Sequence, residues 1–523
     1  ATIGLIMFTI LRLPRSPHSV HTVAMSLASR TTQSTSARAS RLTYPGIQFG
    51  GLKQQPNMRQ LRMFAKTKQS KATASTESPK DLFETRLKKS EEIADAGLFP
   101  YEYKYDISHT AAQVKQEFSA LEPGHEDEDA DVSVAGRIML KRVFGKLAFF
   151  TLQDQTDTIQ LYLDKNRLQD NFPQLKSWFD AGDIIGARGT VKRTEKGEMS
   201  VYVKEWSMLT KALRPLPDKY HGLTDTEQRY RKRHVDLIVN PGVRETFIKR
   251  AKMMREMRNW LDERGFIEVE TPVLHSQAGG ADARPFETFH NTLDMNLTLR
   301  IATELHLKRL IIGGFDRVYE IGRIFRNEGI STRHNPEFTS IELYQAYADF
   351  EDMMEITETL IRHLANVVTG SAVVEYEGKT IDLETPWRRV SMADIVKDKL
   401  PGNLDLSALV NDEEGLASAK AAAKEAGVPN IDDYESVGEV LNACFEELCE
   451  AELIQPTFVI DYPVEVSPLA KPHRSKKGFT ERFELFCVGR EMANAFSELT
   501  DPVDQRQRFE RQARKRESGD LEM

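Results

Sequence analysis

The residues with the clearest capacity for chemistry lie in the stretch 322–347, which reads GRIFRNEGISTRHNPEFTSIELYQAY. Three arginines, three glutamates, a histidine and two asparagines lie in or between two short apolar runs. Arginine can hold a phosphate oxygen, an aromatic ring can stack on a base, and a carboxylate can accept an amine. We interpret the stretch as a nucleotide-binding hairpin. The alternative is a solvated hairpin with scattered charges, because charged side chains normally lie in water.

The two halves of this hairpin have predictable faces, because side chains alternate along a strand. In a first strand over 318–326, one face holds Glu320, Gly322, Ile324 and Arg326. In a return strand over 337–347, one face holds Phe338, Ser340, Glu342 and Tyr344, and the other holds Ile341, Leu343 and Tyr347. One face of the return strand is therefore predicted to be apolar and the other to carry the chemistry.

A second hairpin with polar residues is predicted in the stretch 482–499, RFELFCVGREMANAFSEL, with its turn at Gly489. Glu484 and Glu491 are hard-oxygen ligands of the kind that hold Mg²⁺ together with substrate phosphates. Solvated strand glutamates are the alternative. Parity places Asn494, Phe496 and Glu498 on one face but puts Glu491 on the opposite one. Either a bulge intervenes or one of these assignments is wrong.

The segments before the first hairpin must position it. Asn240 and Pro241 resemble the start of a helix, with Asn240 as its cap. Apolar residues then repeat at helical spacing up to Gly265, namely Phe247, Ala251, Met254, Met257 and Leu261. A strand follows and is interrupted by Pro272. Such a helix and strand can build a dimer interface, and ordinary core packing explains them equally well.

Two further features precede the hairpin. Gly279 and Gly280 open the loop GGADARPFET, where missing side chains let the backbone approach a ligand closely. Thr303 is predicted to cap a helix with Glu304 in its first turn. The helix dipole alone would explain a glutamate at that position.

Residues 132–209 are predicted to form five short strands with a helical insert near 168–179, which is typical of a small barrel of the OB type. Such barrels commonly bind single-stranded nucleic acid. Arg142, Phe149 and Gln160 could supply a phosphate contact, base stacking and base-edge hydrogen bonds. Taken alone, a phenylalanine such as Phe149 is more often a core residue than a platform for a base.

The composition of the chain restricts the classes of protein to which these motifs can belong. The chain has 523 residues, 40% of them hydrophobic, and a net charge of -8, which excludes no class of partner. Its three cysteines have neither zinc-type pairing nor the spacing of a disulfide framework. No apolar run approaches the roughly 18 residues of a membrane helix, so no membrane association is expected.

The first 76 residues contain no Asp or Glu but many Arg, Ser and Thr, which is typical of a transit peptide. A basic arm that binds nucleic acid is the alternative. We divide the chain into a presequence (1–80), a helical extension with an acidic loop at 122–131 (81–131), the barrel (132–212), a linker (213–235) and a C-terminal domain (236–523). A helical insertion is expected in the last of these near 385–453.

With these motifs in place, the chain resembles the class II lysyl-tRNA synthetases over about residues 81–523. The stretch GRIFRNEGISTRHNPEFTSIELYQAYAD is similar to the second motif that defines the class, and the helix and strand that reach Pro272 resemble the first. The resemblance implies an α+β fold, in which an N-terminal OB anticodon-binding domain precedes an antiparallel sheet flanked by helices. It also implies a homodimer with Pro272 in its interface.

The resemblance implies roles for the residues that match. ATP would be bound by Arg326 at the α-phosphate, by Phe338 at the adenine, and by Glu328, His334 and Asn335. Mg²⁺ would be bound by Glu484 and Glu491. The lysine pocket would consist of Gly280, Glu304, Glu342, Tyr344, Asn494, Phe496 and Glu498. The barrel would read the anticodon of tRNA-Lys with Arg142, Phe149 and Gln160.

The implied reaction is attack of the lysine carboxylate on the α-phosphorus of ATP, followed by transfer of the lysyl group to the tRNA. The family's third motif, a glycine-rich segment with an ATP-contacting arginine, is not found before Met523, so we expect this polypeptide to be inactive although it comes from an enzyme. Two alternatives stay open: an aspartyl or asparaginyl synthetase, and an RNA-binding or regulatory derivative. The presequence implies a mitochondrial or plastid location, and a downstream start would give a cytoplasmic form.

Overall fold

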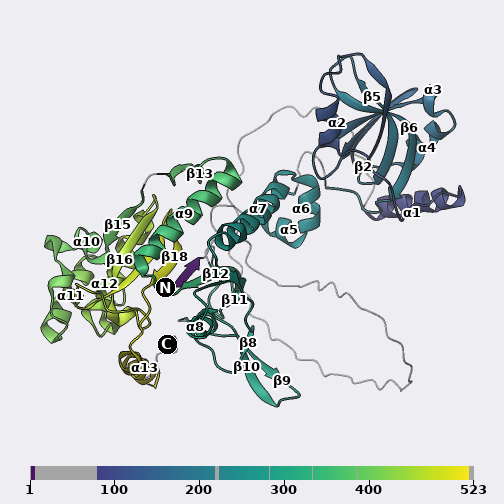
Figure 1. Ribbon diagram of the computed structural model, residues 1–523. Coiled ribbons are helices and arrows are strands. Elements are labelled where there is room, and N and C mark those ends of the chain that lie inside the picture. Colours follow the sequence, from purple (N-terminus) through teal and green to yellow (C-terminus); the bar gives the residue numbers. More distant parts are fainter. Residues whose placement is uncertain are drawn as a thin grey trace, which may run out of the picture. The chain divides into compact units, whose positions relative to one another are not determined.

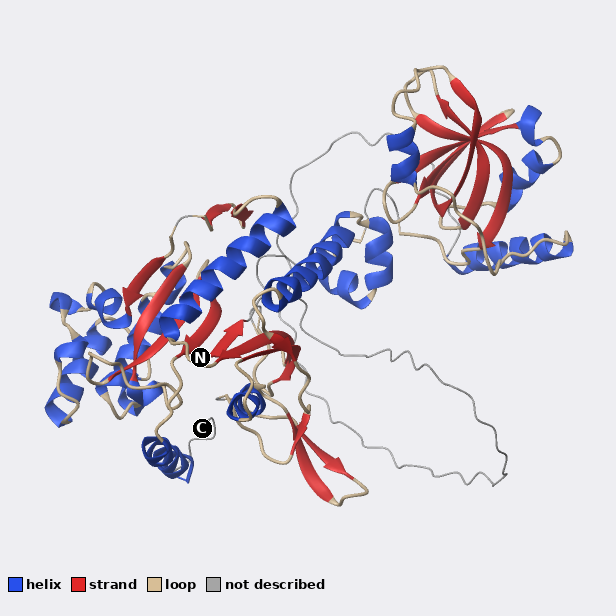
Figure 2. Cartoon of the chain, viewed as in Figure 1, coloured by secondary structure: helices blue, strands red, loops and turns tan. Residues whose placement is uncertain are grey.

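The computed structural model describes Thr2–Leu5 and residues 79–217, 223–281, 283–331, 334–384 and 386–517 (Figures 1 and 2). Two compact units form, one from residues 79–217 and the other from residues 223–517 together with Thr2–Leu5. The presequence expected over 1–80, with no regular structure, lies outside the described residues except at its ends: Thr2–Leu5 forms strand β1 of the sheet described below, and residues 79–80 begin the first helix. None of the helices that the structure describes has both the length and the apolar character needed to cross a bilayer.

The first unit is a closed five-stranded barrel with the strand order β2-β3-β4-β6-β5, which confirms the predicted OB architecture. Inward side chains such as Phe150, Leu161 and Val201 are completely buried, because alternate residues of each strand point into the barrel. Its elements are α1 (Pro79–Asp95), α2 (Ala111–Glu117), β2 (Glu126–Phe144), β3 (Leu147–Gln153), β4 (Thr158–Asp164), α3 (Lys165–Leu168), α4 (Asn171–Trp178), β5 (Ile184–Arg193) and β6 (Met199–Thr210).

The prediction of an acidic loop over 122–131 is wrong in its second half, because β2 begins at Glu126. Glu126 pairs with Lys192 of β5, and its carboxylate accepts hydrogen bonds from Arg167 at 2.9 Å and from the Thr190 hydroxyl at 2.6 Å. Asp131 forms an ion pair with Arg188. These neighbours neutralise the acidic residues, so the segment can join the sheet instead of remaining in solvent.

In the second unit, the predicted linker over 213–235 is partly helical. Helix α5 (Thr226–Arg231) and helix α6 (Arg233–Val239) precede α7 (Gly242–Asp262). The buried carboxylate of Asp236 accepts hydrogen bonds from Arg229 and from the amide of Asn240 at 2.8 and 2.7 Å, respectively. Asn240 therefore stabilises the end of α6, and the prediction that it caps the following helix is wrong.

A mixed sheet of eight strands forms the centre of this unit, in the order β15-β16-β17-β18-β1-β12-β11-β7. It is antiparallel except for its outermost pairs, β15 with β16 and β7 with β11. The bounds are β1 (Thr2–Leu5), β7 (Ile267–Glu268), β11 (Arg317–Phe325), β12 (Glu337–Gln345), β15 (Arg388–Ser391), β16 (Thr457–Pro463), β17 (Phe479–Phe486) and β18 (Glu491–Phe496). Strand β1 pairs with both β12 and β18 and thus lies between the two predicted hairpins.

Helices α7 and α9 (Phe350–Thr369) pack on the sheet through one large apolar core. Asp349 starts α9 with a capping box, and Gly370 ends it with a φ of +86°. In α7, Met257 and Leu261 are buried as predicted, but Phe247 is 43% exposed. Ala251 is also exposed, so core packing within this chain covers only the second half of the predicted apolar stripe.

The predicted helical insertion follows β15 and has its own apolar core. Its main helices are α10 (Met392–Lys397), α11 (Glu413–Glu425) and α12 (Val437–Leu448), joined by short 3-10 turns. The remaining elements are β8 (Leu274–His275), β9 (Glu287–His290), β10 (Met295–Leu299), α8 (Glu304–Ile312), β13 (Val373–Tyr376), β14 (Lys379–Asp382) and α13 (Pro502–Glu517). The α+β fold class predicted from the sequence is confirmed.

Candidate active site and nucleic-acid interface

The β11–β12 hairpin holds Arg326 and Phe338 together. Arg326 follows β11 directly, and its backbone N–H donates to the carbonyl of Pro336 at 2.9 Å. Its guanidinium donates through Nε to the carbonyl of Ile301 at 3.4 Å and lies 5.4 Å from the centre of the Phe338 ring. A cation beside an aromatic plate is the arrangement that parity predicted for a nucleotide phosphate and its base.

The two faces of β12 differ as predicted over most of its length. Ile341 and Leu343 are buried in the core beneath α7 and α9, and the other face carries Phe338 and Glu342. The assignment of Tyr347 to the apolar face is wrong. The strand ends at Gln345, and Tyr347 is fully exposed in a turn with a φ of +60°. A change of backbone direction at the strand end ends the alternation on which the prediction depended.

Glu328, His334 and Asn335, the other residues expected to bind ATP, are exposed on the loop between β11 and β12. His334 is oriented locally, because its Nδ1 lies 2.9 Å from the Ser331 hydroxyl. The structure thus places these three side chains on the loop next to Arg326 and leaves them open to solvent. Their predicted role in ATP binding stays a prediction.

Glu342 is buried and partly unsatisfied. Its Oε1 accepts a hydrogen bond from the backbone N–H of Thr303 at 3.0 Å. Its Oε2 is buried and has no hydrogen-bond partner among the described residues. Burial raises the pKa of Glu342. A buried carboxylate with a spare oxygen stabilises a bound ammonium group, which is the chemistry expected here for an amine.

Glu304 and Glu498 meet around a lysine of the protein itself. Nζ of Lys308 donates to Oε1 of Glu304 at 2.5 Å and forms an ion pair with Oε2 of Glu498 at 2.7 Å. The same ammonium lies 5.5 Å from the centre of the Phe496 ring. Burial raises the pKa of Glu304 to about 7, and the charge of Lys308 opposes that rise. Sequence reasoning missed Lys308, although its spacing of four residues from Glu304 was a usable signal.

Two expectations about this helix start need correction. Thr303 is at the N-cap position of α8, but its side chain makes no capping hydrogen bond. Its N–H is directed to Glu342 instead, because that carboxylate lies beside the helix start. The helix dipole does not suffice to explain Glu304, since only 6% of this residue is exposed and it takes part in a buried ion pair.

The other residues predicted for the lysine pocket lie close to this group or on the adjoining strands. Gly280 has a φ of +90°, and a Cβ there would lie 3.1 Å from the Cβ of Glu304. Tyr344 is 2% exposed and packs against Leu307 of α8. Asn494 on β18 accepts a hydrogen bond from Nε of Arg482 at 3.3 Å.

Glu484 and Glu491 lie on the β17–β18 hairpin, where the register shifts between Leu485 and Phe486. This irregularity resolves the parity mismatch, because it pairs Glu491 with Phe486, which is on the same face as Glu484. Burial and the charge of Glu484 raise the pKa of Glu491 to about 8. Arg482 donates to Glu484 at 2.6 Å. Two neighbouring carboxylates repel each other when both are ionised, and a bound cation stabilises the state in which both are ionised.

A buried ion pair between Arg300 and Glu320 joins the first hairpin to the segment before Pro272. Glu320 also accepts a hydrogen bond from the Thr271 hydroxyl at 2.6 Å, and Arg300 donates to the carbonyl of Arg323 at 2.9 Å. A Cβ at Gly322 would lie 2.2 Å from the Arg300 guanidinium, so a side chain at this position would displace Arg300 from its ion pair. Sequence reasoning missed Arg300, whose partner lies twenty residues away along the chain.

In the barrel, Phe149 points outward and Phe150 inward, so the core explanation applies to Phe150 and not to Phe149. Arg142 lies directly opposite Phe149 in the β2–β3 register, and Oε1 of Gln160 accepts a hydrogen bond from the Ser200 hydroxyl at 2.9 Å. A row of rings crosses this outer face. Phe144 and Tyr162 lie 6.3 and 5.1 Å from Phe149, between ring centres. Aromatic residues beside basic ones suit stacked bases and phosphates.

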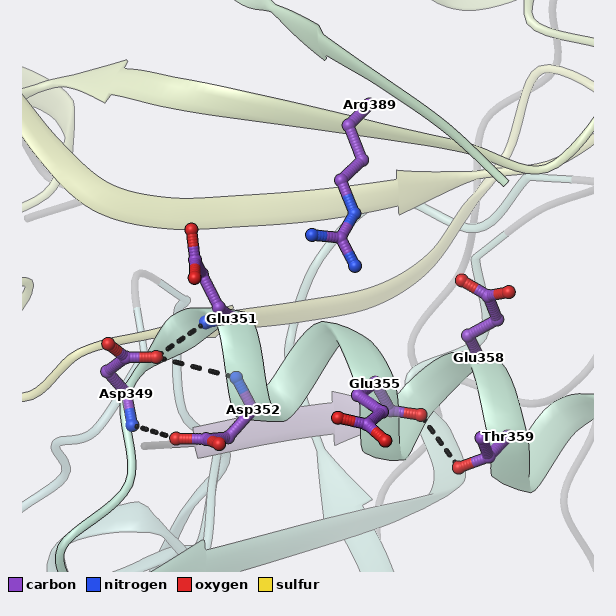
Figure 3. Close-up of a pocket in the computed structure, with 7 residues that line it drawn as sticks. All are labelled: Asp349, Glu351, Asp352, Glu355, Glu358, Thr359 and Arg389. Atoms are coloured by element: carbon purple, nitrogen blue, oxygen red, sulfur yellow. Dashed lines mark hydrogen bonds between the residues drawn. The ribbon is translucent and has the colours of Figure 1, made fainter. Parts of the chain in front are cut away.

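A cavity of about 450 Å³ lies elsewhere in the second unit, along α9. Figure 3 shows Arg389 of β15 reaching toward the acidic side of the helix. Its lining shares no residue with the predicted ATP and lysine sites; it consists of Asp349, Glu351, Asp352, Glu355, Glu358, Thr359 and Arg389. Two of the carboxylates have partners within the chain, Asp349 in Arg474 and Glu358 in Arg362. We therefore interpret the cavity as a hollow in a charged helix surface and do not interpret it as a ligand-binding site.

Comparisons with known proteins agree with the predicted fold and family. A family model described as class II tRNA synthetases (D, K and N) matches residues 225–521, and an OB-fold nucleic acid binding domain matches residues 132–209. A lysine–tRNA ligase of Trichormus variabilis is 60% identical over 453 residues, which cover 85% of this chain and 80% of that protein. The lysine–tRNA ligase of Thermosynechococcus vestitus is 59% identical over 84% of this chain and 86% of its own length. The chain belongs to the class II tRNA synthetases of the D, K and N group, within the family of the lysine–tRNA ligases.

Proposed function

We propose that the chain joins L-lysine to tRNA-Lys in two steps at the site formed by the two hairpins. The lysine carboxylate attacks the α-phosphorus of ATP, and pyrophosphate leaves as lysyl-adenylate forms. The 3′-terminal hydroxyl of the tRNA then attacks the carbonyl of the adenylate, and AMP leaves. The observation that carries the proposal is the pocket of three carboxylates, Glu304, Glu342 and Glu498, on the elements that adjoin Arg326 and Phe338.

The charge of this pocket selects among the substrates of the wider family. Lysine presents an ammonium on its side chain and another at its α-carbon, and buried carboxylates stabilise both. An aspartate side chain would bring a further negative charge into the pocket and be repelled. Glu342, with its unsatisfied Oε2, is assigned to the α-ammonium, and Glu304 and Glu498 are assigned to the side-chain ammonium.

Catalysis in this proposal needs no protein nucleophile, because the substrate carboxylate is itself the attacking group. The guanidinium of Arg326 would neutralise charge that develops on the α-phosphate, and Phe338 would hold the adenine by stacking. Arg326 is held before ATP binds, its backbone by the carbonyl of Pro336 and its guanidinium by the carbonyl of Ile301. Positioning and charge stabilisation are then the main contributions to the rate.

The carboxylates of Glu484 and Glu491 fit Mg²⁺. They are hard oxygen donors on one face of the hairpin, and burial together with the charge of Glu484 raises the pKa of Glu491, so that a bound cation would stabilise the ionised pair. Substrate phosphates would complete the coordination, as is usual for Mg²⁺ at nucleotide sites. When bound, the ion would supply charge neutralisation of the phosphates, and Glu484 and Glu491 would hold it.

The outer face of the barrel is assigned to the anticodon of tRNA-Lys, with Phe149 as the stacking platform, Arg142 for phosphate and Gln160 for a base edge. The aromatic row beside Phe149 supports this assignment.

We assign a homodimer to the chain on the basis of exposed apolar side chains around the predicted first motif. Phe247 and Ile248 of α7 are 43% and 54% exposed, and Val273 and Leu274, next to Pro272, are 38% and 49% exposed. Exposed apolar side chains on these two segments would be covered by a second copy of the chain. Sedimentation velocity tests the assignment. A species of twice the monomer mass supports it, and a monomer at micromolar concentration contradicts it.

The composition of the first 76 residues supports import into a mitochondrion or plastid. A fusion of residues 1–80 to a reporter protein should enter one of the two isolated organelles. A fusion that stays outside both would contradict the proposal.

The proposed reaction is tested by amino-acid-dependent exchange of pyrophosphate into ATP with the full-length protein. Lysine should support the exchange, and aspartate and asparagine should not. Exchange that depends on aspartate or asparagine would contradict the assignment of the carboxylate pocket to lysine.

A further inference from the structure

We propose that Lys308 is a positioning residue that sets the charge of the pocket for the lysine side chain. It holds Glu304 and Glu498 as a pair of ionised carboxylates and leaves them one unit of negative charge for the substrate ammonium. This inference rests on the proposed function, since it concerns the same pocket. The proposed role of Lys308 is to position the two carboxylates, and Lys308 takes no part in the reaction itself.

The geometry places one internal ammonium between two carboxylates from different parts of the chain. Glu304 and Lys308 are one turn apart on α8, and Glu498 follows β18. The two Nζ to oxygen distances are 2.5 and 2.7 Å. The side chains of Glu304, Glu498 and Lys308 are 7%, 20% and 22% exposed, so water screens these charges only in part. Lys308 therefore orders both carboxylates before any substrate binds.

Hydrogen-bonding capacity remains for a ligand. An ionised carboxylate has about four lone-pair positions, and an ammonium has three donors. The hydrogen bond from Lys308 occupies Oε1 of Glu304. The second ammonium that the pocket is proposed to take can thus bind at the remaining lone-pair positions of Glu304, beside Lys308. The Phe496 ring lies 5.5 Å from Nζ of Lys308. It gives this side of the pocket an apolar surface that can also make a cation–π interaction with an ammonium.

The charge count explains selectivity. Two carboxylates and one ammonium leave a net charge of minus one, which a lysine side chain neutralises. A neutral side chain of similar length would leave one buried carboxylate without its counter-charge, which is costly. Without Lys308 the carboxylates would carry two negative charges in a partly buried site, and one of them would take up a proton instead.

The pH dependence follows from the groups that face Glu304. These are Lys308 on α8, Glu498 after β18 and Glu342 on β12. Burial and the two glutamates raise the pKa of Glu304 to about 7, whereas Lys308 lowers it. The carboxyl of Glu304 is ionised above this pKa, so lysine affinity should weaken as the pH falls through about 7. Removal of Lys308 should move this loss of affinity to higher pH.

The test is pyrophosphate exchange with the full-length protein, in which KM for lysine and KM for ATP are measured between pH 6.5 and 9. Lys308→Met should raise the lysine KM roughly tenfold at pH 7.5 and shift its midpoint to higher pH, while the ATP KM changes less than about twofold. Lys308→Arg keeps the charge and should keep the wild-type midpoint. Lys399→Met is the matched control, because Lys399 pairs with Glu452 outside the pocket.

A lysine KM and pH midpoint unchanged in Lys308→Met would overturn the inference. A lower lysine KM in that variant would also overturn it, because Lys308 would then be a competitor for the substrate site. If Lys308→Met does not fold by circular dichroism, the wild-type profile decides: a lysine KM that stays flat between pH 6.5 and 9 contradicts the inference. Absence of lysine-dependent exchange in the wild type would instead contradict the proposed function.

Discussion

At the scale of single residues, the site depends on acidic groups whose ionisation is shifted by burial and by one another. Glu491 shows this most clearly, because burial and Glu484 raise its pKa to about 8. The carboxyl is therefore mainly protonated below pH 8, and a bound cation must displace that proton. The Mg²⁺ concentration for half-maximal exchange should fall as the pH rises from 6.5 to 8.5, by up to about tenfold per pH unit below the pKa.

Magnesium titrations of the exchange rate at several pH values measure this effect. Glu491→Gln should weaken the response to Mg²⁺ and remove its steep pH dependence, whereas Glu452→Gln, at an exposed ion pair with Lys399, should leave both unchanged. A half-maximal Mg²⁺ concentration independent of pH in the wild type would contradict the assignment of Glu491 to the cation.

Residue roles were predictable from the sequence only where they depend on local pattern. Strand parity correctly grouped Phe338 with Glu342 because alternation is a property of the backbone. It failed at Tyr347, which lies beyond the strand end. Arg300 was missed because its partner Glu320 is supplied by the fold; Lys308 has one partner four residues away, Glu304, but its second partner, Glu498, is supplied by the fold. Such pairs join segments whose proximity no local pattern gives.

At the scale of elements, strand β3 of the barrel allows the effects of a mutation on stability and on RNA binding to be measured separately. Its two neighbouring phenylalanine side chains point to opposite faces of the strand. Phe150 is fully buried, and Phe150→Ala should lower the free energy of unfolding of the barrel by about 3–5 kcal/mol. Phe149 points outward, so Phe149→Ala should weaken tRNA-Lys binding roughly tenfold or more with little loss of stability. Urea unfolding and the tRNA KM measure the two effects.

A matched control for this comparison is Tyr103→Ala, since Tyr103 is 94% exposed and lies outside the aromatic row. Equal losses of tRNA affinity in Phe149→Ala and Tyr103→Ala would contradict the assignment of the outer barrel face to RNA. Loss of stability in Phe149→Ala as large as that in Phe150→Ala would contradict the assigned direction of the two rings.

Elements were predicted better in the barrel than in the helix before the first hairpin. The five strands of the barrel follow from alternation and turn residues, both local signals. In α7, spacing predicted a continuous apolar stripe, but Phe247 is exposed while Met257 and Leu261 are buried. Periodicity shows that a helix has an apolar side and does not show how much of it the same chain covers. The uncovered part is the surface that we assign to a second copy.

At the scale of the whole molecule, the chain combines a nucleic-acid barrel with a unit that brings an arginine, an aromatic plate and a set of buried carboxylates onto neighbouring strands. The sequence predicted this division because each unit has its own composition and period. The closure of the carboxylate pocket could not be predicted, since it needs α8, β12 and the end of β18 to meet.

The central claim is that the carboxylate pocket binds the lysine substrate separately from the ATP site. Glu304→Gln tests it most directly, because the change removes one charge and keeps the shape of the side chain. In pyrophosphate exchange, we predict that the lysine KM rises by roughly 10- to 100-fold while the ATP KM stays within about threefold. Equal increases in both KM values, or no increase in the lysine KM, would contradict the account.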